Sequence, residues 1–274
     1  MGDEARSADG IVTTSRDGGG VLHIVLDRAG RRNSLSHSMI DTLINTLAAA
    51  ASDDSLRAVH LSGAGSDFCA GVDWVGSNSG GQRPRTGDLV RRIPHTAHRV
   101  IELIHTLHLP VVCSVRGWAA GMGANLALAA DFTVAAADAV FWEPFVDRGF
   151  SPDSGSTWLL PPGWWGIARA KEMLLLAEKV DAATAAQWGG LIHRSVDDAD
   201  LDATVAALLD RLASGPTVAI GLAKQAINYG QHATLNQAMT QELFNLELSC
   251  RTSDFKEGGL AAFREKRTPG FTGR

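Results

Sequence analysis

An α/β fold that continues into a helical C-terminal region is predicted for this chain of 274 residues. Short apolar segments alternate with helical segments through most of the sequence, which is typical of parallel strands joined by helices. A glycine-rich turn stands between one such strand and the next helix. After Asp198 the segments read as helices only. We therefore expect a flexible N-terminus over residues 1–10, an α/β core over 11–199 and a helical region over 200–274.

The first part of the core is expected to hold two strands around a helix. Val21–Asp27 (VLHIVLD) is a short apolar strand, and residues 56–65 (LRAVHLSGAG) form a second strand that ends in glycines. Ser36 is a suitable N-cap for a helix over residues 37–51, because its hydroxyl can accept a free backbone N–H of the first turn. Residues 75–87 are rich in Gly, Ser, Arg and Pro, which favours a loop.

The middle and the end of the chain continue the pattern. A helix is expected from Asp88 to about His108, and Pro110 marks its end. The segments that follow are predicted as a strand (111–117), a helix (121–130), one or two strands (132–142) and C-terminal helices (200–213, 216–229, 235–249 and 254–266).

Composition and charge exclude several classes of function. A hydrophobic content of 45% supports a large core, and a net charge of −5 argues against general nucleic-acid binding. The three cysteines are odd in number and lack metal-site spacing, which fits a reduced, cytoplasmic protein without a metal. The start MGDEARSADG has no apolar stretch typical of a signal peptide, and charged residues interrupt every apolar segment before the ~20 residues of a membrane span. We expect neither nucleic acid nor membrane as a partner.

The glycine-rich turn within Val115–Asp131 can present backbone N–H groups to a dinucleotide phosphate. Gly117, Gly121 and Gly123 lie between a strand and a helix, as in phosphate-binding turns. However, the turn lies in mid-chain and no clear βαβ unit follows it. The only tyrosine also lacks a lysine four residues later, so the Tyr–Lys pair of short-chain dehydrogenases is absent.

The oxygen of a reacting carbonyl is the second acceptor that this turn could serve. The loop FCAGVD (residues 68–73) also has small residues, and each loop could direct one N–H group to the same oxygen. Such an oxyanion hole stabilises the negative charge that a thioester carbonyl develops when its α- or γ-carbon loses a proton.

The two loops, DFCAGVDW and VRGWAAGMGANLALAAD, resemble those of the crotonase superfamily, the enoyl-CoA hydratases and isomerases. The resemblance continues through LDRAGRRNSLS, RGFSPDSGSTWLLP, AAQWGGLIHRSV and REKRTPGFTG, and covers about residues 11–274. It implies a spiral of ββα units, with C-terminal helices that help to build a homotrimer or a dimer of trimers. It also implies an acyl-CoA thioester as substrate and no separate cofactor, since coenzyme A is part of the substrate.

The resemblance also implies roles for individual positions. The oxyanion-hole N–H groups are expected from Val72 and Met122. Three arginines are expected to supply positive charge near the phosphates of coenzyme A. With them, the residues expected at coenzyme A are Arg28, Arg31, Arg32, Ala70, Phe263 and Lys266. The last two match positions that, in the family, reach the coenzyme from the C-terminal helices, often those of a neighbouring subunit.

The chain departs from the hydratase pattern at both catalytic glutamates. Asn125 and Phe145 occupy those positions, and neither can exchange a proton near neutral pH. Asp153, eight residues past Phe145, matches the place where the family's isomerases carry a carboxylate that moves a proton between the α and γ carbons. Asn125, Trp142, Phe145 and Phe150 are the candidate walls of the acyl pocket. Glu143, just before Pro144, could also face the site, and its alternation relative to Phe145 leaves this open.

The resemblance favours an acyl-CoA isomerase that uses Asp153 alone. SPDSGSTWLLP, GLAKQAIN and FTGR resemble most the ring-epoxide isomerase subgroup, which likewise lacks both glutamates. Two alternatives stay open: an enoyl-CoA hydratase with an atypical site, and a non-catalytic acyl-CoA binding protein. Asp153 could also be only a turn residue, since Ser-Pro-Asp-Ser-Gly is typical of turns. Cys69 has no evident His–Asp partner, so we expect it to be a packing residue.

Overall fold

Two β-sheets form the framework of the fold. The computed structural model describes residues 9–73, 85–160, 166–188 and 191–274. The larger sheet has the strand order β1-β2-β3-β4-β6-β9, in which β1 is antiparallel to β2 and the other neighbours are parallel. Its strands are β1 (Ile11–Arg16), β2 (Val21–Asp27), β3 (Ala58–Gly63), β4 (Val111–Val115), β6 (Phe132–Ala136) and β9 (Arg194–Val196).

The smaller sheet carries the glycine-rich turn. It consists of β5 (Trp118–Ala120), β7 (Val140–Trp142) and β8 (Val180–Asp181), with β7 in the middle, parallel to β5 and antiparallel to β8. Helix α6 (Met122–Ala129) begins directly after β5 and is almost entirely buried. This arrangement places the N-terminus of α6 at the end of the smaller sheet.

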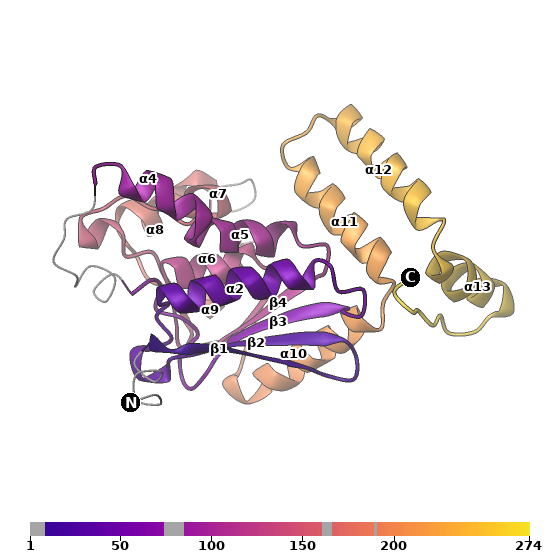
Figure 1. Cartoon of the computed structure of the whole chain (residues 1–274), viewed down its shortest axis with the longest axis horizontal. Helices are drawn as coiled ribbons and strands as arrows, with labels where there is room; N and C mark the ends of the chain where they lie inside the picture. Colours follow the sequence, from indigo (N-terminus) through magenta and orange to yellow (C-terminus); the bar gives the residue numbers. More distant parts are fainter. Residues whose placement is uncertain (1–8, 74–84, 161–165, 189–190) are drawn as a thin grey trace.

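Helices cover the larger sheet, as Figure 1 shows. α2 (His37–Ala50) packs beside α5 (Ala97–Thr106), while α10 (Asp198–Ala213) contacts β3, β4 and β6. All five residues of β4 are buried, as expected for a central strand of a sheet covered on both faces. The remaining core helices are η1 (Ala29–Arg31), α4 (Asp88–Arg92), η2 (Ile93–His95), η3 (Val146–Arg148), α7 (Ser156–Leu159), α8 (Gly166–Leu175) and α9 (Ala182–Gln187).

The C-terminal helices extend away from the core (Figure 1). They are α11 (Thr217–Gly230), α12 (Leu235–Ser249), the π-helical segment η4 (Asp254–Leu260) and α13 (Ala261–Glu265). Lys224 of α11 is buried, and its ammonium lies 2.7 Å from the Asp131 carboxylate and donates to the carbonyl oxygens of Ile104 and Leu109. This buried ion pair therefore joins α11 to the core.

No single helix in the described part of the chain is long and apolar enough to cross a membrane. Helices α10 and α11 together have the length and the apolar composition of a membrane span, but the chain bends by 104° at the break between them.

Several predicted elements are confirmed, and one long helix is wrong. The Ser36 hydroxyl accepts the Met39 N–H and begins α2, as expected of an N-cap. The single helix expected over residues 88–108 is instead divided into α4, η2 and α5. Pro94 lies within η2 and has no N–H to donate, which explains the interruption. Most of the expected loop over 75–87 lies outside the described residues, and the expected boundary at residue 200 falls inside α10.

Candidate active site

The two small-residue loops meet, as the sequence predicts. The Cys69 N–H donates to the Trp118 carbonyl, and the Ala120 N–H donates to the Cys69 carbonyl, each at 2.9 Å. These bonds pair Cys69 with Ala119 of strand β5, and Met122 begins α6 two residues after β5 ends. The loops therefore form one continuous backbone surface at the N-terminus of α6.

Glycine is required where the loops approach each other. Gly71 has φ +91°, and a methyl group on it would lie 2.8 Å from the Ala120 carbonyl oxygen and 3.6 Å from the Met122 nitrogen. A methyl group on Gly123 would lie 2.1 Å from the Cys69 carbonyl oxygen. A side chain at either position would force the backbones apart, so these glycines bring Val72 beside Met122.

The N–H groups of Val72 and Met122 have no hydrogen-bond acceptor within the described residues. Val72 pairs with Leu35 through the carbonyl of Gly71 and the N–H of Asp73, which leaves its own N–H unused. Met122 is the first residue of α6, where helical N–H groups have no acceptor inside the helix. Two donors are thus available for one oxygen, which is what an oxyanion hole needs.

Phe145 and Phe150 connect this region to Asp153. A methyl group on Gly121 would lie 3.9 Å from Cζ of Phe145, so that buried ring lies against the start of α6. The rings of Phe145 and Phe150 meet edge to face with centroids 5.8 Å apart. Phe150 in turn lines a pocket together with Asp153. An apolar wall therefore runs from the N-terminus of α6 to this carboxylate.

The pocket at Asp153 has a volume of about 510 Å³ and is mostly apolar. The described residues that line it are Leu89, Val90, Ile93, Pro94, His98, Phe150, Ser151 and Asp153. The Asp153 carboxylate accepts a hydrogen bond of 2.6 Å from the Ser154 hydroxyl. The Asp153 backbone carbonyl, by contrast, accepts the N–H and the hydroxyl of Ser156. Hydrogen bonds to the Asp153 backbone carbonyl thus stabilise the turn, and the turn does not depend on the carboxylate that lines the pocket.

Asn125 and Glu143 are buried close to this carboxylate. Asn125 donates from Nδ2 to the Ser156 hydroxyl at 2.9 Å, but its Oδ1 has no partner among the described residues. Glu143 is fully buried, and neither of its oxygens has such a partner. Burial and the charge of Asp153 raise the pKa of Glu143 well above its usual range. The sequence leaves Glu143 undecided, because its alternation relative to Phe145 does not show whether it faces the site.

Trp142 is not brought to the Asp153 pocket. Its indole N–H donates to the Ala177 carbonyl at 2.9 Å, and its ring packs near Trp118 and the Lys179 ammonium. Successive strand residues point to opposite faces, and Phe141 and Glu143 are the buried neighbours of Trp142. Trp142 is thus directed away from the pocket.

The residues expected at coenzyme A are only partly brought together. The Ala70 N–H donates to the Arg32 carbonyl at 2.9 Å, and the Arg31 and Arg32 side chains are exposed beside this loop. Arg28 stands apart from this group: its side chain is buried and lies 2.8 Å from Asp73, which offsets its charge.

Phe263 and Lys266 lie at the far end of the C-terminal helices. Phe263 is on α13 and 84% exposed, and Lys266 follows that helix. Figure 1 shows α13 at the opposite end of the molecule from α4 and α7. The same chain therefore does not bring these two residues to the Asp153 pocket.

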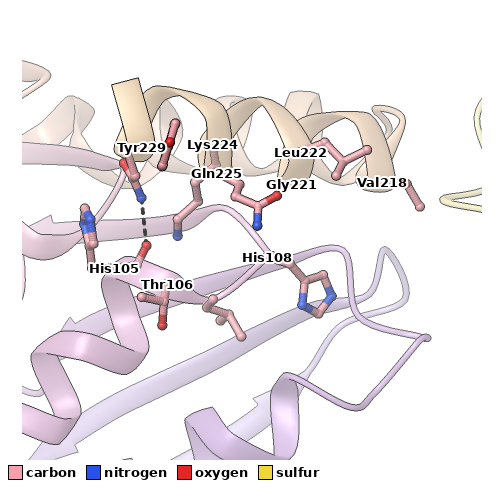
Figure 2. Close-up of a pocket in the computed structure, with 11 residues that line it drawn as sticks. His105, Thr106, His108, Val218, Gly221, Leu222, Lys224, Gln225 and Tyr229 are labelled. Atoms are coloured by element: carbon pink, nitrogen blue, oxygen red, sulfur yellow. Dashed lines mark hydrogen bonds between the residues drawn. The ribbon is translucent and has the colours of Figure 1, made fainter. Parts of the chain in front are cut away.

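Other candidate groups do not form a second reactive site. Burial raises the pKa of the Cys69 thiol to about 12, so Cys69 is not a thiolate nucleophile at neutral pH. No group of three or more His, Cys, Asp or Glu residues could hold a metal within the described ranges. A pocket of about 460 Å³ lies between the end of α5 and α11, where Asn228 donates to the His105 carbonyl (Figure 2). None of the sequence-predicted site residues lines it.

Comparisons with known proteins agree with this geometry. Residues 16–274 match the family model described as enoyl-CoA hydratase/isomerase. The 1,2-epoxyphenylacetyl-CoA isomerase of Escherichia coli is 39% identical over 93% of this chain and 96% of its own length. The 2,3-dehydroadipyl-CoA hydratase of the same organism is 32% identical over 93% and 96%.

Solved structures give the same result. The enoyl-CoA hydratase of Bacillus anthracis superposes with a TM-score of 0.87 at 31% identity, over 96% of this chain and 99% of that one. An enoyl-CoA hydratase of Polaromonas sp. JS666 gives 0.86 at 30% identity, over 96% and 100%. The sheets, the glycine-rich turn and the match over nearly the whole chain thus have one explanation: the chain has the crotonase fold and belongs to the enoyl-CoA hydratase/isomerase family.

Proposed function

We propose that this family member is an acyl-CoA isomerase with Asp153 as its catalytic base. The observation that carries the proposal is the pair of buried residues at the hydratase glutamate positions, Asn125 and Phe145, beside a pocket that Asp153 lines. Among the described lining residues Asp153 is the only carboxylate. Water addition needs one group to activate the water and a route for a proton to carbon, whereas a double-bond shift needs one base.

The proposed reaction moves one proton within the substrate. Asp153 removes a proton from the α-carbon of a 3-enoyl thioester, and the electron pair of that C–H bond moves into the conjugated enolate. The N–H groups of Val72 and Met122 stabilise the oxygen that gains negative charge. The double bond shifts as Asp153 returns the proton to the γ-carbon, which regenerates the carboxylate. The apolar wall of Phe145 and Phe150 excludes water that would quench the enolate.

Coenzyme A is proposed to bind along the backbone of Arg31, Arg32 and Ala70, with its phosphates near the exposed guanidinium groups of Arg31 and Arg32. In this proposal Phe263 and Lys266 reach the coenzyme of a neighbouring subunit, because their own pocket is distant. No separate cofactor takes part.

Wild-type protein incubated with a 3-enoyl-CoA is expected to form the conjugated 2-enoyl-CoA without 3-hydroxyacyl-CoA. Product analysis by chromatography and mass spectrometry separates these outcomes. In a second incubation, with 2-enoyl-CoA as substrate, a 3-hydroxyacyl-CoA product would instead favour the hydratase, the activity named for the E. coli relative at 32% identity. Binding of acyl-CoA without turnover would favour a non-catalytic binding protein. A ring-epoxide acyl-CoA, the substrate class in the name of the other E. coli relative, is the second substrate.

A homotrimer or a dimer of trimers is expected in solution. The C-terminal helices expose large apolar side chains, among them Leu235 (75%), Leu243 (66%) and Phe244 (65%), and a patch of this kind marks an interface. Light scattering after size-exclusion chromatography should give three or six chain masses for the wild type. Leu243→Glu combined with Phe244→Asp should give one mass, while the exposed neighbour Glu242→Gln should not change it. A wild-type monomer would contradict the proposal.

A further inference from the structure

Glu143 is a buried carboxyl that the proposed reaction does not use. It is fully buried at the end of β7, and its two oxygens have no hydrogen-bond partner among the described residues. An ionised carboxylate in such a place would lose its hydration without compensation, at a large cost in free energy. Buried unsatisfied groups of this kind are rare in native proteins and call for a specific explanation.

The hydrogen bonds around Ser156 explain what Glu143 lacks. The Ser156 hydroxyl has one proton, which it donates to the Asp153 carbonyl at 2.8 Å, and it accepts the Asn125 amide at 2.9 Å. Ser156 also lies beside the Glu143 carboxyl and lowers its pKa against the larger effects of burial and Asp153, although no hydrogen bond of normal geometry joins the two. While its proton is donated to the Asp153 carbonyl, Ser156 can offer Glu143 only a lone pair. The unpartnered Asn125 Oδ1 is a further acceptor in this group.

The group around Ser156 therefore contains more acceptors than donors, and one proton on Glu143 would supply the missing donor. We propose that Glu143 carries this proton in the folded enzyme and is a positioning residue. As a neutral acid it fixes the side chains of Ser156 and Asn125. Asp153 is then the single negative charge among the described residues of the site. Asp153 is the charged side chain that, together with burial, raises the pKa of Glu143. Two carboxyls in different surroundings thus take different protonation states.

The role assigned to Glu143 rests on the proposed function of Asp153, but the proton itself can be tested without substrate. Burial and Asp153 raise the pKa of Glu143 in the folded state. At a pH between the pKa of Glu143 in the unfolded chain and its higher pKa in the folded chain, the unfolded chain has lost this proton and the folded chain has kept it. Stability therefore falls as pH rises through that window. Glu143→Gln removes the titration while it keeps an amide donor of similar shape.

The melting temperature of Glu143→Gln should rise relative to wild type as pH increases from about 5.5 to 8.5. The expected change is roughly 2–4 °C per pH unit until the folded pKa is passed. The exposed Glu178→Gln is the matched control, and its difference from wild type should stay constant over this range. A constant difference for Glu143→Gln as well would show an ordinary ionised glutamate and overturn the proposal.

Three further measurements test the coupling and the positioning role. In an Asp153→Asn background, the pH range over which Glu143→Gln raises the melting temperature progressively should end at a lower pH. An unchanged range would overturn the coupling between Asp153 and Glu143. Glu143→Gln should keep kcat/KM within about threefold, whereas Glu143→Leu, which has no donor, should lose about tenfold or more. In the pH profile of kcat/KM, Glu143→Gln should abolish the alkaline limb caused by ionisation of Glu143. Equal activities of the Gln and Leu variants would overturn the positioning role, independently of the test on Asp153.

Discussion

Asp153→Asn is expected to lower kcat/KM for conversion of 3-enoyl-CoA to 2-enoyl-CoA by about 10²–10⁴-fold, the usual contribution of a general base. The physical reason is that an amide cannot accept the α-proton. The substitution is otherwise conservative. The backbone carbonyl of Asp153, rather than its carboxylate, accepts the N–H and hydroxyl of Ser156. Asparagine can also accept the Ser154 hydroxyl, so the turn should be retained.

Three measurements separate the loss of a base from a loss of structure. The Kd of a saturated acyl-CoA, determined by calorimetry, should change by less than about threefold, because the carboxylate is not expected to contribute to coenzyme binding. The melting temperature should be nearly that of the wild type. Asp147→Asn, an exposed aspartate six residues earlier, is the matched control and should retain full activity. An active Asp153→Asn variant would show that another group is the base and that Asp153 is only a turn residue.

The sequence was sufficient for features that depend on local chemistry. Ser36 has the side chain that a helix N-cap needs, and it caps α2. The small residues around Gly71 and Gly123 indicated a close approach of two backbones, and the loops do meet there. Such features could be predicted because the residue type itself restricts the conformation.

Features that depend on distant partners could not be predicted in the same way. Arg28 resembled its neighbours Arg31 and Arg32 in sequence, but Asp73, 45 residues later, neutralises it. Alternation along residues 140–145 did not reveal which side of β7 would be buried, so Glu143 stayed undecided and Trp142 was assigned to the pocket. Pro94 is different, because it interrupts the helical pattern by a local property, the lack of a backbone donor, that the sequence already contains. For Arg28, Glu143 and Trp142, by contrast, a contact made only in the folded chain decides the outcome.

Gly71→Ala is expected to lower kcat by about 10²–10³-fold, the effect of losing one oxyanion-hole donor. The backbone at Gly71 has φ +91°, and the new methyl group would lie 2.8 Å from the Ala120 carbonyl oxygen. Because that neighbour is backbone, the strain cannot be relieved by a side-chain rotation, and residues 71–72 must move away from α6. The Val72 N–H then no longer shares an acceptor with the Met122 N–H.

Gly166→Ala separates this displacement from backbone strain as such. Gly166 also has a positive φ, +81°, but no atom of the described residues lies within 4 Å of a methyl group placed on it. Both variants should lose about 1–2 kcal/mol of stability from the left-handed conformation, measured as a shift of the urea midpoint. Only Gly71→Ala should also lose kcat, with the KM of the 3-enoyl-CoA changed far less, because the donor acts mainly on the charge of the transition state. If both variants kept wild-type kcat, the Val72 N–H would not belong to the oxyanion hole; if both lost it equally, strain rather than the position of Val72 would explain the loss.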